Sequence, residues 1–151
     1  MRVSARADYA LRALIELAAD NTRPLTCEEI ASAQDVSARF LKAVIAQLRR
    51  SDLVRSQRGC EGGYWLARPA AKITVGDVVR AVDGPFPAMH GEPAARPAFA
   101  GPALALDELW RAAAASLERV VDEVTIVDLV EGRLPVGVTE QLTAPIVGVA
   151  G

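Results

Sequence analysis

Two short amphipathic segments joined by a tight turn constrain the fold of this chain more than any other feature. Thr26 followed by Glu29 has the form of a capping box and predicts a short helix over residues 27–33. After the turn "QDV", Ser37 opens a second helix over residues 38–50. Two helices this short and this closely joined indicate a helix–turn–helix.

Helices are also predicted on both sides of this pair. Apolar residues spaced three and four apart follow Ser4, a residue suited to a helix N-cap, and continue to Ala19. Thr74 followed by Asp77 begins another helix, which Gly84 ends. The fold is therefore predicted to be mainly α-helical around the helix–turn–helix.

The stretch "RSQRGCEGGYWLARP" follows the second helix of the pair directly. Residues 53–57 and 64–67 read as strands that flank its glycines. A phosphate-binding P-loop is excluded because no lysine follows the second glycine, and a dinucleotide-binding turn is excluded because no helix opens after the glycines. The sequence predicts a small β-hairpin, which behind a helix–turn–helix is a wing; a hairpin that merely closes the domain is the alternative.

The chain divides into four parts by composition. We expect residues 1–84 to form the winged helix–turn–helix domain. Residues 85–103 hold five prolines and two glycines and are predicted to be a loop without regular structure. Residues 104–134 carry the longest helical pattern and a short helix after it, and residues 135–151 are expected to be a loose tail.

The long helix carries an apolar stripe from Leu106 to Val124 that is broad for a helix so near the C-terminus. Such a face needs a partner, either the first domain or a second copy of the chain. Because helix–turn–helix proteins usually bind two half-sites as dimers, we expect a homodimer in which this helix is the dimerisation element.

Charge is distributed unevenly along the chain. The net charge is −2, but residues 1–72 hold 12 basic and 8 acidic side chains, whereas residues 73–151 hold 5 and 11. Residues 39–58 contain six basic side chains and one acid, Asp52. A basic strip on an otherwise acidic protein favours one surface that faces a polyanion.

Composition also bears on compartment and catalysis. The apolar run "LRALIELAA" is interrupted by Arg12 and Glu16, so neither a signal peptide nor a membrane span is expected, and a cytoplasmic protein without membrane contact is predicted. With a single histidine in the proline-rich loop, neither a Ser-His-Asp nor a Cys-His arrangement can be assembled. The chain is not expected to be an enzyme.

Three stretches of the chain resemble, in order, the Rrf2 family of bacterial transcriptional regulators, which includes IscR, NsrR and CymR. They are "MRVSARADYALRALIELA", "DVSARFLKAVIAQLRRSDLVRSQRGCEGGYWLARPAAKITVGDVVRAVDG" and "LWRAAAASLERVVDEVTIVDLV". The resemblance covers residues 1–134, and "LVRSQRGCEGGYWLARP" is its most specific part. It implies a winged helix–turn–helix with a long C-terminal dimerisation helix, binding to double-stranded DNA, and transcription regulation, with a repressor expected.

Many members of this family hold an iron–sulfur cluster through three cysteines in the loop before the dimerisation helix. That loop contains no cysteine here, so the resemblance implies a subgroup without those ligands, and neither a cofactor nor a metal site is expected. Asp8 stands where some cluster-binding relatives place a carboxylate ligand, but without the thiolates it is interpreted as a surface charge. His90, a single imidazole, is interpreted as an exposed loop residue.

The residues expected to contact DNA come from the second helix of the pair and from the hairpin. Arginine and lysine pair with guanine edges or phosphates, and glutamine pairs with adenine. Glycines at a hairpin tip allow close approach to DNA, and an arginine there can enter the narrow minor groove. The candidates are Ser37, Arg39, Phe40, Lys42, Ala43 and Gln47 in the helix, and Arg55, Arg58, Gly59 and Arg68 in the hairpin.

Phe40 has two possible roles, and the charge of Lys42 bears on how DNA binding is controlled. Phe40 either contacts a thymine methyl group or staples the helix to the core. Some family members carry an acid near the position of Lys42 that opposes the entry of DNA. The resemblance therefore implies that a lysine makes DNA binding less dependent on activation.

The two cysteines are candidates for a redox switch. Cys27 lies in the first turn of a helix, where the helix dipole can lower the pKa of a thiol, and Cys60 lies at the hairpin tip beside Arg58. The alternative is that both are small residues in permissive places. Two other functions also stay open: a regulator controlled by a small-molecule or protein effector or by oxidation of Cys60, and an interaction module that has lost DNA binding.

Overall fold

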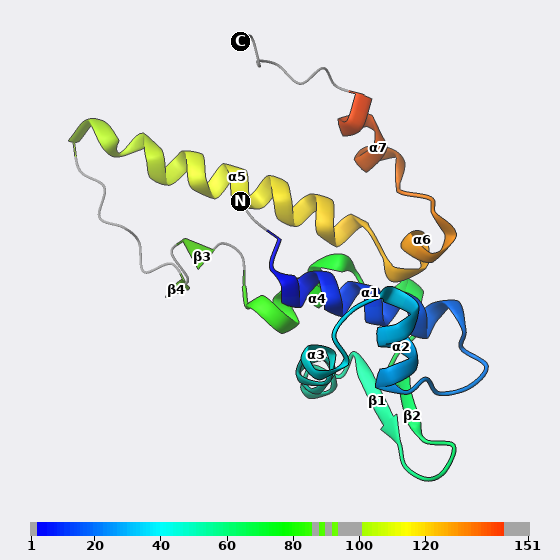
Figure 1. The fold of residues 1–151 in the computed structure, drawn as a ribbon. Helices are drawn as coiled ribbons and strands as arrows, with labels where there is room; N and C mark the ends of the chain where they lie inside the picture. Colours follow the sequence, from blue (N-terminus) through cyan, green and yellow to red (C-terminus); the bar gives the residue numbers. More distant parts are fainter. Residues whose placement is uncertain (1–2, 86–87, 90–91, 94–100, 144–151) are drawn as a thin grey trace.

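The computed structural model describes residues 3–85, 88–89, 92–93 and 101–143 (Figure 1). The first part consists of helices α1 (Ala5–Ala19), α2 (Cys27–Gln34) and α3 (Ala38–Arg50), strands β1 (Val54–Gln57) and β2 (Gly63–Leu66), the 3-10 turn η1 (Ala70–Lys72) and helix α4 (Val75–Asp83). The second part contains strands β3 (Ala88–Met89) and β4 (Glu92–Pro93), the 3-10 turn η2 (Gly101–Ala103) and helices α5 (Ala105–Glu123), α6 (Ile126–Glu131) and α7 (Val136–Thr143). The predicted fold class is confirmed.

The helix–turn–helix is set by local hydrogen bonds. The hydroxyl of Thr26 accepts a hydrogen bond from the backbone N–H of Glu29, and the Glu29 carboxylate accepts one from the backbone N–H of Thr26, which completes the capping box of α2. The Ser37 hydroxyl caps α3 by accepting from the backbone N–H of Phe40. Asp35 ends α2 at φ 50° and ψ 51°, a left-handed conformation that aspartate tolerates and that turns the chain into α3.

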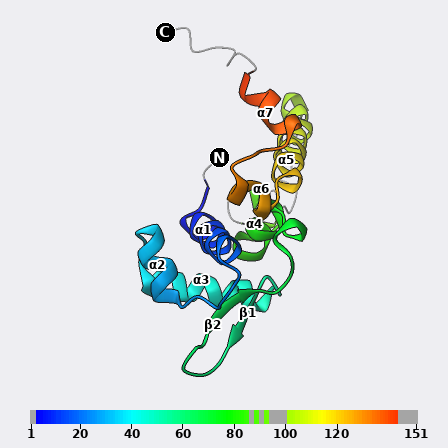
Figure 2. The ribbon, with the colours of Figure 1, turned by 90° about the vertical axis from the view of Figure 1, so that its right-hand side faces the viewer.

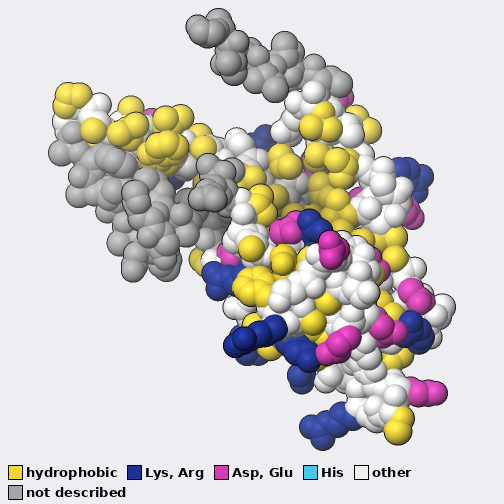
Figure 3. Space-filling model, in the orientation of Figure 1, with side chains coloured by type: hydrophobic (Ala, Val, Ile, Leu, Met, Phe, Trp, Pro, Cys, Tyr) yellow, Lys and Arg dark blue, Asp and Glu magenta, His cyan; other side chains and the backbone are white. Residues whose placement is uncertain are grey.

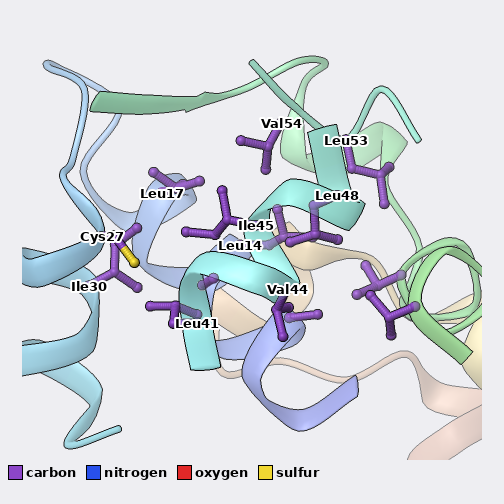
Figure 4. Close-up of a cluster of buried hydrophobic side chains, with 14 of the residues drawn as sticks. Leu14, Leu17, Cys27, Ile30, Leu41, Val44, Ile45, Leu48, Leu53 and Val54 are labelled. Atoms are coloured by element: carbon purple, nitrogen blue, oxygen red, sulfur yellow. The ribbon is translucent and has the colours of Figure 1, made fainter. Parts of the chain in front are cut away.

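One hydrophobic core joins these elements (Figure 4). The inward face of α3 supplies Leu41, Val44, Ile45 and Leu48, none of them more than 1% exposed. Helix α1 packs against α3 and buries Ala10 and Ala13 completely; because alanine is small, the two helices can approach closely. Ile126 of α6 is also fully buried in this core, so the second part of the chain is attached to the first by an apolar contact.

Strands β1 and β2 form an antiparallel hairpin with Arg55 opposite Trp65. On the other side of β2 the backbone of Tyr64 exchanges two hydrogen bonds with that of Leu25, which anchors the base of the hairpin to the segment before α2. Gly63 is required beside this bridge, because a Cβ atom there would lie 2.7 Å from the carbonyl oxygen of Leu25. The tip projects from the body as the predicted wing (Figure 2).

Helix α5 passes α4 and projects with its N-terminal half beyond the body of the molecule (Figures 1 and 2). Its C-terminal end is joined to the first part by a β-bridge between Thr74 and Thr125. The guanidinium of Arg80 on α4 also donates to both carboxylate oxygens of Asp122 on α5, at 3.2 and 2.6 Å. The junction therefore combines backbone pairing with a bidentate ion pair.

The second part differs from the sequence prediction in two segments. Residues 85–103, expected to lack regular structure, contain the two-residue strands β3 and β4 and the turn η2. The tail from residue 135, expected to be loose, begins with helix α7, in which Val138 is buried and the carbonyl of Pro135 accepts two backbone hydrogen bonds. This helix has too little periodicity to be read from sequence, and a contact with α5 supports it. The boundaries of the four parts stay predictions.

Candidate nucleic-acid interface

Helix α3 turns its polar face to solvent on the side away from the core. Arg39, Lys42 and Ala43 are exposed, Ser37 is exposed at the N-cap, and Gln47 is half-buried one turn further on. The two arginines of the last turn are exposed as well. Figure 3 shows Lys and Arg side chains gathered over α3 and at the wing tip. The predicted helix contacts therefore share one basic surface, although contact with DNA itself stays a prediction.

Phe40 lies at the edge of this surface. Its ring meets the ring of Tyr9 of α1 edge-on, with the centroids 5.0 Å apart and the planes at 87°. This contact ties the N-terminal end of α3 to α1 and favours the stapling interpretation. The side chain is nevertheless 39% exposed, which leaves an edge available for a thymine methyl group.

Lys42 forms an ion pair that sequence reasoning missed. Its Nζ lies 2.7 Å from Oε1 of Glu28 in the first turn of α2. The hydrogen bond from Lys42 holds the pKa of Glu28 below its ordinary value, and the same bond raises the pKa of Lys42. Both side chains are more than half exposed, so the pair is weak and a phosphate oxygen can take the place of the carboxylate.

The outer face of the hairpin carries three side chains in contact. Because side chains alternate along a strand, Arg55 and Gln57 of β1 lie on the same face as Trp65 of β2. The guanidinium carbon of Arg55 lies 5.9 Å from the centroid of the Trp65 ring, and the indole Nε1 donates to Oε1 of Gln57 at 3.0 Å. Arg55 was a sequence candidate; the other two were missed, although strand alternation was the signal that could have found them.

The remaining hairpin candidates lie at and beyond the tip. Gly59 has a φ of +112°, a conformation that favours glycine, and so allows the sharp turn. Arg58 is exposed and forms neither an ion pair nor a hydrogen bond with any residue that the structure describes. Arg68 is exposed just after β2. The three arginines are thus distributed along the hairpin, one in a strand, one at the tip and one past its end.

A cleft of about 470 Å³ separates the end of α3 from β1. It is lined by Arg49, Arg50 and Arg55 together with one acid, Asp52. Three arginines and a single acid line this cleft, so basic residues outnumber acidic ones where the helix and the hairpin meet. The basic surface is therefore continuous from α3 to the wing.

The cysteines occupy different environments. Cys27 is buried, and its Sγ lies 3.6 Å from the carbonyl oxygen of Ala38. The prediction that the helix dipole lowers the pKa of this thiol was wrong: burial, with a smaller contribution from Glu28, raises it. Cys60 is exposed at the tip of the wing, as expected. Accessibility therefore favours Cys60 over Cys27 as a redox candidate, and the switch itself stays a prediction.

Two residues that the sequence analysis considered and set aside as metal ligands are Asp8 and His90. Asp8 forms an ion pair with Arg12, one turn away on α1, at 2.9 Å. His90 lies outside the described residues. Within the part of the chain that the structure describes, no three His, Cys, Asp or Glu side chains come together as a set of metal ligands.

A helix–turn–helix with an exposed basic second helix, followed by an arginine-bearing hairpin, defines the winged helix–turn–helix class of DNA-binding proteins. Over residues 3–132 the chain matches the family model described as "Rrf2: Iron-dependent Transcriptional regulator". The chain therefore belongs to the Rrf2 family.

Individual relatives agree with this assignment. The Mycobacterium tuberculosis protein Rv1287, which is named as an HTH-type transcriptional regulator, is 41% identical over 136 residues, covering 89% of this chain and 84% of the relative. The regulator CymR of Bacillus subtilis is 32% identical over 134 residues, covering 85% and 89%. The structure of B. subtilis CymR, described as the global cysteine regulator, matches with a TM-score of 0.74 at 31% identity over 87% of this chain and 98% of CymR. The structure of T. potens IscR matches with a TM-score of 0.70 at 29% identity over 87% of this chain and 88% of IscR.

These similarities make the chain a DNA-binding HTH-type transcriptional regulator and not an enzyme. None of the helices formed by the described residues is long and apolar enough to cross a membrane.

Proposed function

We propose that this regulator is a homodimer that binds a pseudo-palindromic operator and represses transcription without an iron–sulfur cluster. One observation carries the dimer: none of the 19 residues of α5 is buried within a single chain. Leu106, Leu109 and Trp110 are between 39% and 55% exposed, and Leu104 just before the helix is 61% exposed. A contiguous apolar face of this kind marks an interface, and a second copy of α5 is the partner of matching chemistry.

A dimer through α5 supports two-site DNA recognition. Each copy places an α3 in a major groove and directs its wing toward the adjacent minor groove, and the α5 pair sets the distance between the two half-sites. Contacts within the chain hold both parts of the basic surface, with α3 packed in the core and the hairpin bridged to the segment before α2. A protein whose DNA-binding surface needs no activating ligand occupies its operator by default, and this supports repression. The proposed compartment is the cytoplasm, where the chromosome lies.

The family description refers to iron, so the ligand set of this chain has to be compared with what a cluster requires. The chain has two cysteines, one buried beside α3 and one at the wing tip, and none between α4 and α5. These residues do not fit a thiolate-ligated cluster. An absorbance spectrum of anaerobically purified protein should show no charge-transfer bands; visible bands with stoichiometric iron would contradict this part of the proposal.

The dimer is tested by Leu109→Asp, which places a charge on the exposed α5 face. Sedimentation should show a monomer, and affinity for a two-half-site duplex should fall on the order of 100-fold because the second half-site no longer adds avidity. Ala71→Asp, at an exposed position of η1, is the matched control and should leave both unchanged. If the Leu109→Asp protein remains dimeric, α5 is not the dimer interface.

The DNA surface is tested by Lys42→Glu. Reversal of this charge should weaken binding on the order of tenfold at low salt, to cognate and non-cognate duplexes alike, because a phosphate contact carries no sequence information. Arg133→Glu at the end of α6 makes the same change in net charge and should have little effect. Unchanged affinity of the Lys42→Glu protein at low salt would exclude Lys42 from the interface.

Control by oxidation of Cys60 is the second candidate, because this thiol is exposed at the tip that is expected to approach DNA. Genomic footprints of the purified protein should weaken after treatment with a thiol oxidant, and Cys60→Ser should abolish the response. Footprints that are unchanged by oxidant would leave control to a small-molecule or protein effector. The absence of any footprint on duplex DNA would support an interaction module instead.

A further inference from the structure

We infer that Trp65 is a positioning residue of the DNA-binding wing, which holds Arg55 and Gln57 in place for contact with the duplex. The inference rests on the proposed DNA-bound arrangement and concerns how the wing obtains its affinity. It places the main wing contact in the strands of the hairpin, at Arg55, and not at the tip.

The geometry of the hairpin singles out this residue. Trp65 stands directly opposite Arg55 in the antiparallel register, and the guanidinium lies over its ring at 5.9 Å. The same indole donates its N–H to the side-chain oxygen of Gln57, two residues along β1, at 3.0 Å. One half-buried ring therefore fixes two polar side chains on the outer face of the wing.

Arg55 and Arg58 differ in what surrounds them. Both are exposed, and neither forms an ion pair with an acid that the structure describes. Among the described residues, Arg58 has neither a ring nor a hydrogen-bonding partner that restricts its side chain. It therefore loses its full rotamer freedom when it binds a phosphate. Arg55 already lies over a ring that restricts it, and the restriction reduces the entropy lost on binding.

The position of Arg55 fits the same role. It lines the cleft between α3 and β1 together with Arg49 and Arg50. In the proposed DNA-bound arrangement, the phosphate backbone between the major-groove helix and the wing lies beside this cleft. The planar guanidinium of Arg55 can stack on Trp65 through its face while its N–H groups remain free to bind phosphate oxygens.

The stack is first tested without DNA. In a Trp110→Phe background Trp65 is the only tryptophan, so its fluorescence reports on this site alone. Arg55→Ala should raise quenching by acrylamide, a neutral quencher, because the guanidinium no longer covers the ring; Arg58→Ala should not. Equal quenching of the Trp110→Phe protein and of its Arg55→Ala and Arg58→Ala variants would show that Arg55 does not cover Trp65. This result does not depend on whether the protein binds DNA.

The positioning role is then tested on a labelled duplex that the wild-type protein has selected from a random-sequence library. Trp65→Leu should weaken binding roughly three- to tenfold, the cost of holding a side chain that is no longer restricted, with an unchanged salt slope because no phosphate contact is lost. Arg55→Ala should weaken binding and reduce the salt slope by about 0.9. Trp65→Phe, which keeps an aromatic face, should retain most of the affinity.

A double-mutant cycle decides between positioning and a general effect on the fold. In the Arg55→Ala protein, Trp65→Leu should cost at most about twofold more, from Gln57 alone, whereas in the Arg58→Ala protein it should keep its full effect. An equal cost in both backgrounds would overturn the inference, and thermal unfolding of each variant identifies a loss of folding. If the wild-type protein selects no duplex, the proposed function fails, and the acrylamide result still decides whether the stack exists.

Discussion

The winged helix–turn–helix and helix α5 show how the same kind of apolar spacing leads to opposite results. In the first, apolar positions of α1, α2, α3 and α4 close on one another, and the inward face of α3 is almost completely buried. In the second, a helix of 19 residues with a comparable stripe buries none of them. An amphipathic pattern specifies that a face needs a partner, and it does not specify where the partner comes from.

The N-terminal caps of the helices also distinguish α1 to α4 from α5. Helices α1 to α4 each begin with a Ser or Thr side chain that accepts a backbone hydrogen bond. Helix α5 begins at Ala105, and Leu104 at its N-cap position provides no side-chain hydrogen bond. The first unit therefore combines local and tertiary stabilisation, whereas α5 depends on contacts near its C-terminal end and on whatever covers its apolar face.

Paired truncations give the largest expected contrast. Leu48→Ala, in the core of the first unit, should lower the free energy of unfolding by about 2–5 kcal/mol, because it removes buried methyl groups and leaves a cavity. Leu109→Ala should change it by less than about 0.5 kcal/mol at concentrations where the protein is monomeric. Denaturant unfolding at low and high protein concentration measures both.

The concentration dependence makes this comparison specific. If α5 pairs with a second copy, the effect of Leu109→Ala should grow as the protein concentration rises, whereas the effect of Leu48→Ala should not. A large effect of Leu109→Ala in the monomer would mean that α5 is stabilised by its own chain, and the contrast between the two regions would disappear.

A smaller effect is expected where the two regions meet. Asp122→Asn removes the charge that Arg80 binds from α4 and should lower stability by about 0.5–1 kcal/mol, since both side chains are partly exposed. Asp107→Asn is the matched control, because it breaks an ion pair with Arg111 that lies entirely within α5. Thermal unfolding should show a greater loss for Asp122→Asn; equal losses would mean that the junction pair does not couple the regions.

The smallest expected effect is on the stability of the fold at acidic pH. Hydrogen bonds from the hydroxyl and the backbone N–H of Thr125 hold the pKa of Asp128 below its ordinary value in the folded chain. A carboxyl with a depressed pKa stabilises the fold above its unfolded pKa, and this contribution is lost as the pH falls below about 4. Asp128→Asn should therefore make thermal stability less dependent on pH between about 5 and 2. A pH profile identical to that of the wild type would show that ionisation of the Asp128 carboxyl contributes nothing to stability.

Elements with local determinants were predicted closely. Helix α3 begins and ends at the predicted residues, because the Ser37 cap and the spacing of Leu41, Val44, Ile45 and Leu48 both act within a few residues. The strands were predicted to within one residue at each end. In α1 the buried residues are Ala7, Ala10, Ala13, Leu14 and Leu17, in agreement with the predicted spacing of three and four.

The errors lie where a distant contact outweighs a local tendency. The helix position of Cys27 predicted a lowered thiol pKa, but packing against the start of α3 buries the thiol and raises its pKa. The tail after Pro135 has no clear period, and helix α7 forms there in contact with α5. Neither the ion pair of Lys42 with Glu28 nor the contact of the Arg55 guanidinium with the Trp65 ring follows from sequence separation alone.

The sequence by itself determined the helix–turn–helix, its caps, the hairpin behind it and the basic strip that crosses both, because these depend on residues a few positions apart. Only the tertiary structure decided how the basic side chains are held: Lys42 against an acid of α2, Arg55 over an indole of the facing strand, and Arg58 without a partner among the described residues. The reason is physical. Charge is a property of each residue, whereas the orientation and freedom of a charged side chain depend on neighbours that folding brings together.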